Sequence, residues 1–388
     1  MARKGKIPME LNELREQINQ IDDEMARLFA KRMDTVLQVA QSKKESGKPV
    51  LDRSRERQVL ARVAEQVGEP YEPYSTVLWN VLFDLSRSYQ NQMLSQGSPL
   101  AQAIESACQN TPPLFPKKAT VAVQGVEGAY SQQACDKLFS LPTVLYFNQF
   151  EGVFQAVQQG LCQYGILPIE NSSAGSVTQV YDLMKRYQFH IVRSIKLKVD
   201  HTLLANPGVQ LADIRQVVSH DQGIRQCSEW LKQHPEIQVT TMANTAAAAQ
   251  FVAQSGRRDV AAISSRTCAE LYGLQVIGEN FQNSDHNYTR FICISKQMEI
   301  FPGANKISLM LTLPHKPGSL YSLIARFSAL GLNLTKLESR PMPGKDFEFM
   351  FYFDFDASCY APETVNMLGG LARDLESFTF LGSYSEVF

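Results

Sequence analysis

The N-terminal segment carries cations on a helical face that is otherwise apolar. Arg32 and Lys43 continue this face, and Arg15 lies at its edge. Burying an unpaired cation costs several kcal/mol, so each of these side chains must meet an anion. That anion is either a protein carboxylate in a buried ion pair or an acidic group of a ligand. The face itself is defined by apolar residues in steps of three and four, namely Leu11, Leu14, Ile18, Ile21, Met25 and Leu28.

The next two helical runs supply polar side chains with compatible chemistry. The sequence DRSRE puts Asp52, Arg55 and Glu56 within about one turn of a helix start. Ser86 and Gln90 stand four residues apart in the third run and therefore stack on one face of a helix. Acidic, basic and amide groups are thus available to surround a small anionic molecule.

The first helix is too long for its own domain to cover. If it runs from Met9 to Ser46, it is about 57 Å long, since a helix rises about 1.5 Å per residue. Two shorter helices of the same chain cannot cover that length. We therefore expect a second copy of the chain to complete an intertwined dimer.

These residues, in this order and spacing, resemble the AroQ-type chorismate mutase domain, which would occupy residues 9–95 as an all-α, three-helix unit. The resemblance implies that Arg15 reaches into the site of the other subunit, and that Asp52 and Glu56 engage the hydroxyl side of the substrate. The whole implied site is Arg15, Arg32, Lys43, Asp52, Arg55, Glu56, Ser86 and Gln90.

The remaining implied roles suit the chemistry of a Claisen rearrangement. Arg32 and Arg55, assisted by Ser86, would hold the two carboxylates of chorismate in the reactive conformer. Lys43 and Gln90 would face the ether oxygen, where negative charge develops as the C–O bond breaks. The reaction needs no nucleophile and no external acid or base, only clamping and well-placed donors.

The central region alternates short β-rich runs with helical runs, which is typical of an α/β fold. Five polar clusters sit where a predicted strand meets a helix: GVEGAYS (125–131), IENSSAGSV (169–177), SHDQGIRQC (219–227), NTAAAA (244–249) and NYTRF (287–291). Each cluster alone is consistent with ordinary helix capping. The first lacks the GxGxxG pattern and a Walker lysine, which argues against a nucleotide site.

Taken together, the clusters resemble the prephenate dehydratase family across residues 119–297. The resemblance implies two α/β lobes like those of type II periplasmic binding proteins, with the site in the cleft. Lobe one would hold about 119–199 and the returning segment 278–297, and lobe two 201–277. The implied substrate-binding residues are Glu170, Asn171, Ser172, Ser219, Gln226, Thr245, Thr289 and Arg290.

The implied reaction expels carbon dioxide and the ring hydroxyl and leaves an aromatic ring. The family's residue for hydrogen-bonding or protonating the hydroxyl corresponds to Thr289, which by itself is a poor acid and is interpreted as a donor or relay. Ser219 and Gln226 would orient the substrate, Thr245 would lie near a carboxylate at a helix start, and Arg290 would be an anion partner. Glu170 and Asn171 would order the site across the cleft, whereas loop or capping roles are favoured for His220, Asp285 and His286.

The C-terminal region, residues 306–388, changes to the order strand, helix, strand, strand, helix, strand, which predicts a ferredoxin-like α+β sandwich. The runs HKPGSLYSL and LESRP resemble an ACT regulatory domain of the dehydratase type. Such domains pair side by side, and the resemblance implies phenylalanine at the pair's interface near Gly318, Ser319, Leu320, Glu338, Ser339 and Arg340. A dimerisation module without a ligand is the alternative.

Bulk properties are consistent with a multidomain cytoplasmic enzyme that has no cofactor. The chain has 388 residues, 44% hydrophobic and 20% charged residues, and a net charge of -1, so no nucleic acid or membrane partner is expected. The N-terminus lacks the apolar segment of a signal peptide. Seven scattered cysteines and six dispersed histidines predict reduced core thiols and no metal site.

The sequence therefore predicts a homodimer or dimer of dimers with mutase, linker (96–118), dehydratase and regulatory segments in that order. It would convert chorismate to prephenate and then to phenylpyruvate, with phenylalanine as the regulator. Two alternatives remain. One is a monofunctional dehydratase with a structural helical domain, and the other is a small-molecule sensor without catalysis.

Overall fold

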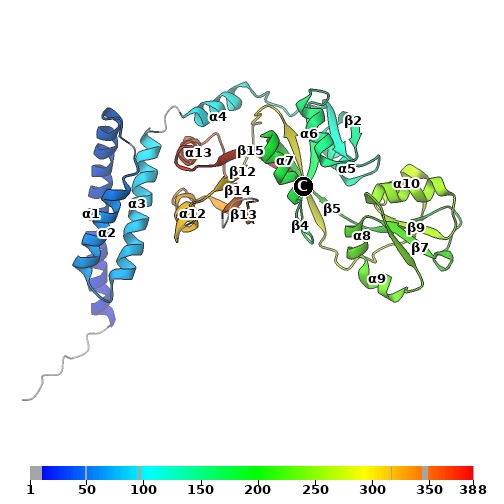
Figure 1. Ribbon diagram of the computed structural model, residues 1–388, viewed down its shortest axis with the longest axis horizontal. Helices are drawn as coiled ribbons and strands as arrows, with labels where there is room; N and C mark the ends of the chain where they lie inside the picture. Colours follow the sequence, from blue (N-terminus) through cyan, green and yellow to red (C-terminus); the bar gives the residue numbers. More distant parts are fainter. Residues whose placement is uncertain (1–10, 49, 95–97, 316, 343–347, 388) are drawn as a thin grey trace, which may run out of the picture. The chain divides into compact units, whose positions relative to one another are not determined.

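The computed structural model describes residues 11–48, 50–94, 98–315, 317–342 and 348–387 (Figure 1). Its contacts divide the chain into two units, and each unit contains segments that are distant in sequence. The first comprises Met1–Gln102, Leu313–Asn333 and Pro362–Leu375, and the second Ala103–Thr312, Leu334–Ala361 and Glu376–Phe388. The predicted ends at Met9 and Ser95 lie outside the described residues.

Helices form the first unit throughout its described part. They are α1 (Leu11–Glu45), α2 (Arg53–Val67), α3 (Glu72–Leu94), the start of α4 (Pro99–Asn110), α12 (Ser319–Ala329) and α13 (Pro362–Asp374). With 35 residues, α1 is about 52 Å long. Both α1 and α2 pack on α3.

Local signals at the helix ends explain where α1 and α2 begin and end. Glu13 lies in the first turn of α1, and Lys43 and Lys44 lie in its last turn, so their charges complement the helix dipole. The Asp52 side chain accepts a hydrogen bond from the backbone N–H of Arg55 and so caps α2. In α1, however, Ala40 is the one residue of the helix that is buried.

The second unit contains two β-sheets. The larger sheet has the strand order β13-β14-β12-β15-β5-β11-β3-β1-β2, with β4 beside β3. Its strands are β1 (Lys118–Gln124), β2 (Leu141–Phe147), β3 (Tyr164–Asn171), β4 (Gly175–Ser176), β5 (His190–Lys198), β11 (Tyr288–Ser295), β12 (Lys306–Thr312), β13 (Asn333–Pro341), β14 (Phe349–Asp356) and β15 (Phe378–Val387).

The smaller sheet has the order β10-β6-β9-β7-β8. It contains β6 (Thr202–Ala205), β7 (Gln216–Ser219), β8 (Gln238–Thr241), β9 (Val260–Ser264) and β10 (Gln275–Gly278). The chain thus leaves the larger sheet after β5 and returns to it with β11. This agrees with the two-lobed organisation that the sequence predicts, with the lobe boundary one residue later, at Gly278.

The helices of the second unit connect these strands. They are α5 (Tyr130–Leu138), α6 (Phe150–Gln158), α7 (Thr178–Tyr187), the short 3-10 turn η1 (Leu211–Asp213), α8 (Asp221–Gln226), α9 (Ser228–Gln233), α10 (Thr245–Ser255) and α11 (Thr267–Tyr272). The inner strands β1, β3 and β11 bury apolar side chains on both faces, and Val121, Ile166 and Ile292 are fully inaccessible.

The C-terminal strand β15 joins the strands after residue 305 to lobe one. Ser385 pairs with Arg193 and Val387 with Ile195, in parallel with β5. The approach just before this pairing requires glycine, because Gly382 has φ 149° and an added Cβ would lie 2.2 Å from the Ile191 carbonyl oxygen. From β12 to β15 the elements follow the predicted order strand, helix, strand, strand, helix, strand.

Six of the seven cysteines are buried, Cys108 is half-buried, and all seven are free thiols, as predicted. Among the described helices, none combines the length and the apolar character that crossing a bilayer requires.

Candidate active sites

In the helical region, one group of predicted residues comes together. Arg32 on α1 donates a hydrogen bond to the Ser86 hydroxyl and another to the Leu82 carbonyl, both on α3. Burial lowers the pKa of Arg32. Gln90, 6% exposed, donates to the Ser86 carbonyl, while its own Oε1 is buried without a partner. An arginine beside an unsatisfied amide oxygen forms a polar patch between α1 and α3.

The described hydrogen bonds of this patch involve none of the other predicted mutase residues. Lys43 is half-buried and donates to the Val50 carbonyl in the α1–α2 loop, and Asp52 and Arg55 are exposed at the start of α2. Arg15 is exposed and lies about 25 Å from Arg32 along the helix axis, since 17 residues separate them. One chain therefore does not assemble the whole predicted set.

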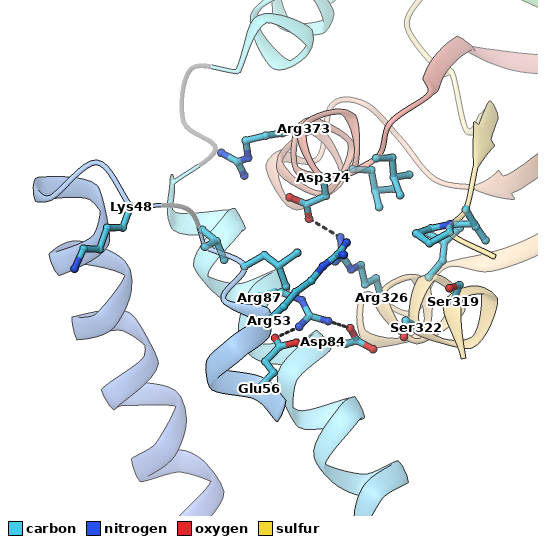
Figure 2. A pocket seen from close by; sticks show the side chains of 17 residues that line it. Lys48, Arg53, Glu56, Asp84, Arg87, Ser319, Ser322, Arg326, Arg373 and Asp374 are labelled. Carbon is cyan, nitrogen blue, oxygen red and sulfur yellow. Dashed lines mark hydrogen bonds and ion pairs between the residues drawn. The ribbon is translucent and has the colours of Figure 1, made fainter. Parts of the chain in front are cut away.

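Glu56 takes part in an ion-pair group that the sequence did not predict. The Arg87 guanidinium pairs with both Glu56 and Asp84 (Figure 2). These three residues line a cavity of about 520 Å³ within the first unit, together with Ser319 and the Arg326–Asp374 ion pair. Apart from Glu56 and Ser319, this cavity contains none of the predicted site residues, so it is distinct from the Arg32 patch.

In the two-lobed region, four of the predicted residues line one cavity of about 320 Å³: Asn171, Gln226, Thr245 and Thr289. Thr289 is the second residue of β11 and Asn171 is the last residue of β3, and these neighbouring strands pair with the two residues opposite each other. Thr245 starts α10, which Asn244 caps by accepting from the Ala247 N–H. Because a helix N-terminus attracts anions, this end of the cavity suits a carboxylate.

The hydrogen bonds of Thr289 leave its proton available to the cavity. Thr289 is 8% exposed, and its Oγ1 accepts from Asn171 Nδ2 at 2.9 Å. Asn171 Oδ1 in turn accepts from the backbone N–H groups of Ser173 and Ala174, which fixes the amide orientation. No described residue accepts the Thr289 hydroxyl proton. Thr289 can therefore donate to a ligand oxygen.

The other four predicted dehydratase residues do not line this cavity. Ser219 is fully buried and donates to the Ile263 carbonyl, and an added Cβ on Gly223 would lie 2.8 Å from its oxygen, so the serine lies under the start of α8. Ser172 is exposed and bonds to the backbone of His286 and Tyr288.

Arg290 and Glu170 point away from the cavity and pair with each other. Arg290 Nη2 lies 2.6 Å from Asp354 on β14 and 3.0 Å from Glu170. Although burial opposes the charge, Tyr384, Asp354 and Glu170 raise the pKa of Arg290 well above its ordinary value. The geometry therefore does not support the predicted contact of Arg290 with a substrate anion.

The ion pairs continue along β13, where part of the predicted regulatory set lies. Lys336 bonds to Glu170 and Ser176 and lies 3.3 Å from Glu338, which also bonds to Arg340. Ser339 is exposed on the same strand. Gly318, with φ 84°, precedes α12, in which Leu320 is half-buried and the Ser319 hydroxyl is buried without a partner.

Sequence reasoning missed two buried residues of the cleft. His201 lines the 320 Å³ cavity and bonds to Gln226 through Nε2, and burial lowers its pKa. Asn287, 2% exposed, bonds to both Asn171 and Gln226. Asn287 stands at the start of the cluster NYTRF, so its position was a usable signal. His201, a single histidine after a strand, carried none.

Comparison with known families matches both regions. The profile described as chorismate mutase type II matches residues 14–91, and the prephenate dehydratase profile matches residues 121–299. The bifunctional chorismate mutase/prephenate dehydratase of Escherichia coli K12 is 30% identical over 382 residues, which cover 96% of this chain and 95% of that protein.

Other relatives match the part of the chain after the helical region. An arogenate dehydratase/prephenate dehydratase of Arabidopsis thaliana is 38% identical over 284 residues, covering 69% of this chain and 72% of that protein. The crystal structure of prephenate dehydratase from Arthrobacter aurescens in complex with L-Phe has a TM-score of 0.62 and 28% identity, and covers 69% of this chain and 89% of that one.

Fold, site and profiles thus define a protein that joins a mutase-type helical region to a two-lobed dehydratase region in one chain. The chain belongs to the family of bifunctional chorismate mutase/prephenate dehydratases.

Proposed function

We propose that this chain rearranges chorismate to prephenate in its helical region and converts prephenate to phenylpyruvate in the cleft between its two lobes. The observation that carries the second activity is the Thr289 hydroxyl, whose oxygen accepts a hydrogen bond from Asn171 while its proton is free to be donated into the cavity that both residues line. The first activity rests on the match of residues 14–91 and on the Arg32, Ser86 and Gln90 patch.

For the mutase reaction, Arg32 and Arg55 would clamp the two carboxylates, and Lys43 and Gln90 would serve the ether oxygen. The unsatisfied Gln90 Oε1 is an acceptor that no described residue fills. A rotation of this amide would present its N–H₂ instead, which suits an oxygen that gains negative charge. Glu56 and Asp52 remain proposed partners of the hydroxyl side.

For the dehydratase reaction, the electrons of the ring carboxylate's C–C bond enter the ring as carbon dioxide leaves. The C4–O bond breaks at the same time, and the departing oxygen takes up a proton and leaves as water. Thr289 would donate to that oxygen as charge develops on it. No lysine or arginine lines the described cavity, so the helix start at Thr245 and amide N–H groups would receive the carboxylates.

We also propose that residues 306–388 form an ACT-type ferredoxin-like domain that binds phenylalanine and inhibits the enzyme. The L-Phe-bound relative supports this, and so do the ion pairs from Arg340 and Glu338 through Lys336 to Glu170, the neighbour of Asn171. A ligand that moves β13 would disturb these pairs. Feedback requires that phenylalanine bind two states of the enzyme with different affinity.

A second copy of the chain is part of the proposal. The apolar stripe of α1 stays exposed in one chain, from 43% at Leu14 to 66% at Leu28, and such a stripe needs an apolar partner. In an intertwined homodimer, or a dimer of such dimers, α1 of one copy would cover α1 of the other. Arg15 would then reach the Arg32 patch of the other subunit.

A product assay on purified protein tests the proposal. Chorismate is supplied with and without phenylalanine, and the quench is neutral because acid alone aromatises prephenate. Phenylpyruvate that forms and declines with added phenylalanine is the expected result. Accumulated prephenate would remove the dehydratase, and no turnover of chorismate or prephenate would favour a sensor. A parallel assay with L-arogenate decides whether the substrate range follows the plant relatives.

A further inference from the structure

Three side-chain amides and one imidazole form a hydrogen-bonded chain that crosses between the lobes at the dehydratase cleft. Asn171 and Asn287 belong to lobe one, and Gln226 and His201 to lobe two. Asn171 Nδ2 lies 2.9 Å from Asn287 Oδ1, Asn287 Nδ2 lies 3.0 Å from Gln226 Oε1, and Gln226 Oε1 lies 2.8 Å from His201 Nε2. We call these four residues the amide relay.

The direction of every bond in the amide relay follows from the backbone. Two backbone N–H groups point at Asn171 Oδ1, so the group that Asn171 turns to Asn287 is its N–H₂. Asn287 must then accept with Oδ1 and donate with Nδ2. Gln226 receives that donor with Oε1. His201 Nε2, facing the same oxygen, must carry a hydrogen.

These hydrogen-bond directions determine which atom of the Gln226 amide remains free to bind a ligand in the cavity. Its carbonyl oxygen is occupied by Asn287 and His201, whereas its Nε2 has Asn287 Oδ1 at 3.4 Å as its one described partner. A free N–H hydrogen therefore remains on a side chain that lines the cavity. Because no lysine or arginine is among the described residues that line this cavity, an amide N–H is one of the few groups there that can donate a hydrogen bond to a bound anion.

We propose that Asn287 is a positioning residue for the dehydration: by fixing the Gln226 amide, it presents an N–H rather than a carbonyl oxygen to the anionic substrate. Asn287 does this from a buried position, through Gln226. The same residue accepts from Asn171, which holds the oxygen of Thr289. This inference rests on the proposed dehydratase activity.

The decisive variant is Asn287→Asp, which keeps the size of the side chain and replaces the donor by an acceptor. Two oxygens would then face each other unless the Gln226 amide turns over. After turning, Gln226 Nε2 faces both the introduced carboxylate and His201, so the hydrogen of the neutral imidazole must move from Nε2 to Nδ1. The Gln226 carbonyl oxygen then faces the cavity and repels the substrate carboxylates.

Nitrogen NMR of the protein labelled with ¹⁵N-histidine reads the tautomer directly, without substrate. The His201 signal is assigned by its absence in His201→Gln. The expected result is an Nε2–H tautomer in the wild type and an Nδ1–H tautomer in Asn287→Asp. We expect KM for prephenate to rise about tenfold, equivalent to about 1.4 kcal/mol, with a smaller change in kcat.

Ser284→Asp is the matched control, because it adds the same charge at an exposed position of the neighbouring cavity that Asn287 and Gln226 also line, while the described bond of the Ser284 side chain is to the His286 N–H. It should leave the His201 tautomer unchanged and raise KM far less. A wild-type His201 with Nδ1–H, which is read without the Asn287 variant, overturns the relay, and so does an unchanged tautomer in folded Asn287→Asp. No wild-type turnover of prephenate overturns the proposed function and the positioning role of Asn287 together.

Discussion

The helical region and the two-lobed region differ in how far one chain completes them. In α1 the apolar stripe is 43–66% exposed from Leu11 to Leu28, whereas core residues of the larger sheet such as Val121 and Ile166 are fully buried. The same contrast holds for polar groups. Thr289, Asn171 and Gln226 form one hydrogen-bonded cluster around a cavity, while Arg15 and Arg32 lie about 25 Å apart along α1.

From this contrast we expect that one chain suffices for the proposed dehydratase site and that the proposed mutase site needs a second copy. A region that buries its own core and pairs its own polar groups needs no partner chain to be complete. A long helix with an exposed apolar stripe and widely separated cations needs a partner chain to cover the stripe and to bring the cations together. Mutations in the helical region should therefore change mutase activity alone, and mutations in the two-lobed region should change dehydratase activity alone.

The largest effect is expected at Thr289. Replacing it by valine keeps the shape and removes the donor, so dehydratase kcat should fall about 10²–10³-fold, the usual effect of losing one donor to a developing charge. Thr289→Ser, which keeps the hydroxyl, should retain most of the activity. Mutase turnover of chorismate, measured on the same preparations, should stay at the wild-type level. A parallel loss of both activities would contradict separate sites.

Arg32→Ala should reduce mutase kcat/KM by about 10²-fold, because it removes a carboxylate clamp and the donor to the Ser86 hydroxyl, which keeps only its bond to the Leu82 carbonyl. Arg27→Ala, an exposed arginine on the same helix, is the control and should change the rate little. Prephenate turnover should be unchanged in both variants. Equal rates for Arg32→Ala and wild type would exclude Arg32 from the site.

A smaller effect is expected for the ion pair behind the cleft. Asp354→Asn leaves Arg290 with Glu170 as its remaining carboxylate, so we expect the free energy of unfolding to fall by about 1–3 kcal/mol. Inhibition by phenylalanine should weaken as well. Asp356→Asn, an exposed position two residues further along β14, should cost well under about 1 kcal/mol in the same urea titrations. Equal losses in the two variants would refute a special role for the Arg290 pair.

The last expected effect is a gradual one, the pH dependence of stability. Burial lowers the pKa of His190 and His201, so below about pH 6.5 the unfolded chain binds protons that the folded unit does not. The free energy of unfolding should therefore fall as the pH drops from 7 to 5, by at most about 1.4 kcal/mol per pH unit for each histidine. His190→Phe, which removes one of the two buried imidazoles, should flatten the slope. A stability that rises on acidification would be inconsistent with this account.

The periodicity of apolar residues and the order of β-rich and helical runs predicted much of the fold. The steps of three and four in α1 and the run YGILPIEN, which is β3 residue for residue, were visible in the sequence. Side-chain direction at the site was less well predicted, although the signal existed. Thr289 and Arg290 are neighbours on one strand and must point to opposite faces, as must Asn171 and Glu170.

Other parts of the site depend on tertiary contacts that no local pattern encodes. His201 and Gln226 are 25 residues apart, and Asn287 is a further 61 residues along the chain, so their relay exists only in the folded lobes. The buried partner of Arg290 comes from β14, in the region assigned to regulation. The sequence motifs assigned the dehydratase region and the C-terminal region to separate domains. In the structure, one sheet connects them, because β15 pairs with β5.

Mixing two inactive variants tests the central contrast most directly. Arg15→Ala and Arg32→Ala chains with different tags are unfolded, mixed in equal amounts and refolded, and mutase activity is compared with each variant refolded alone. If Arg15 serves the site of the other subunit, a mixed dimer regains one intact site, and the mixture recovers about a quarter of wild-type activity. Activity no higher than the mean of the separate variants would show that each chain holds its own mutase site.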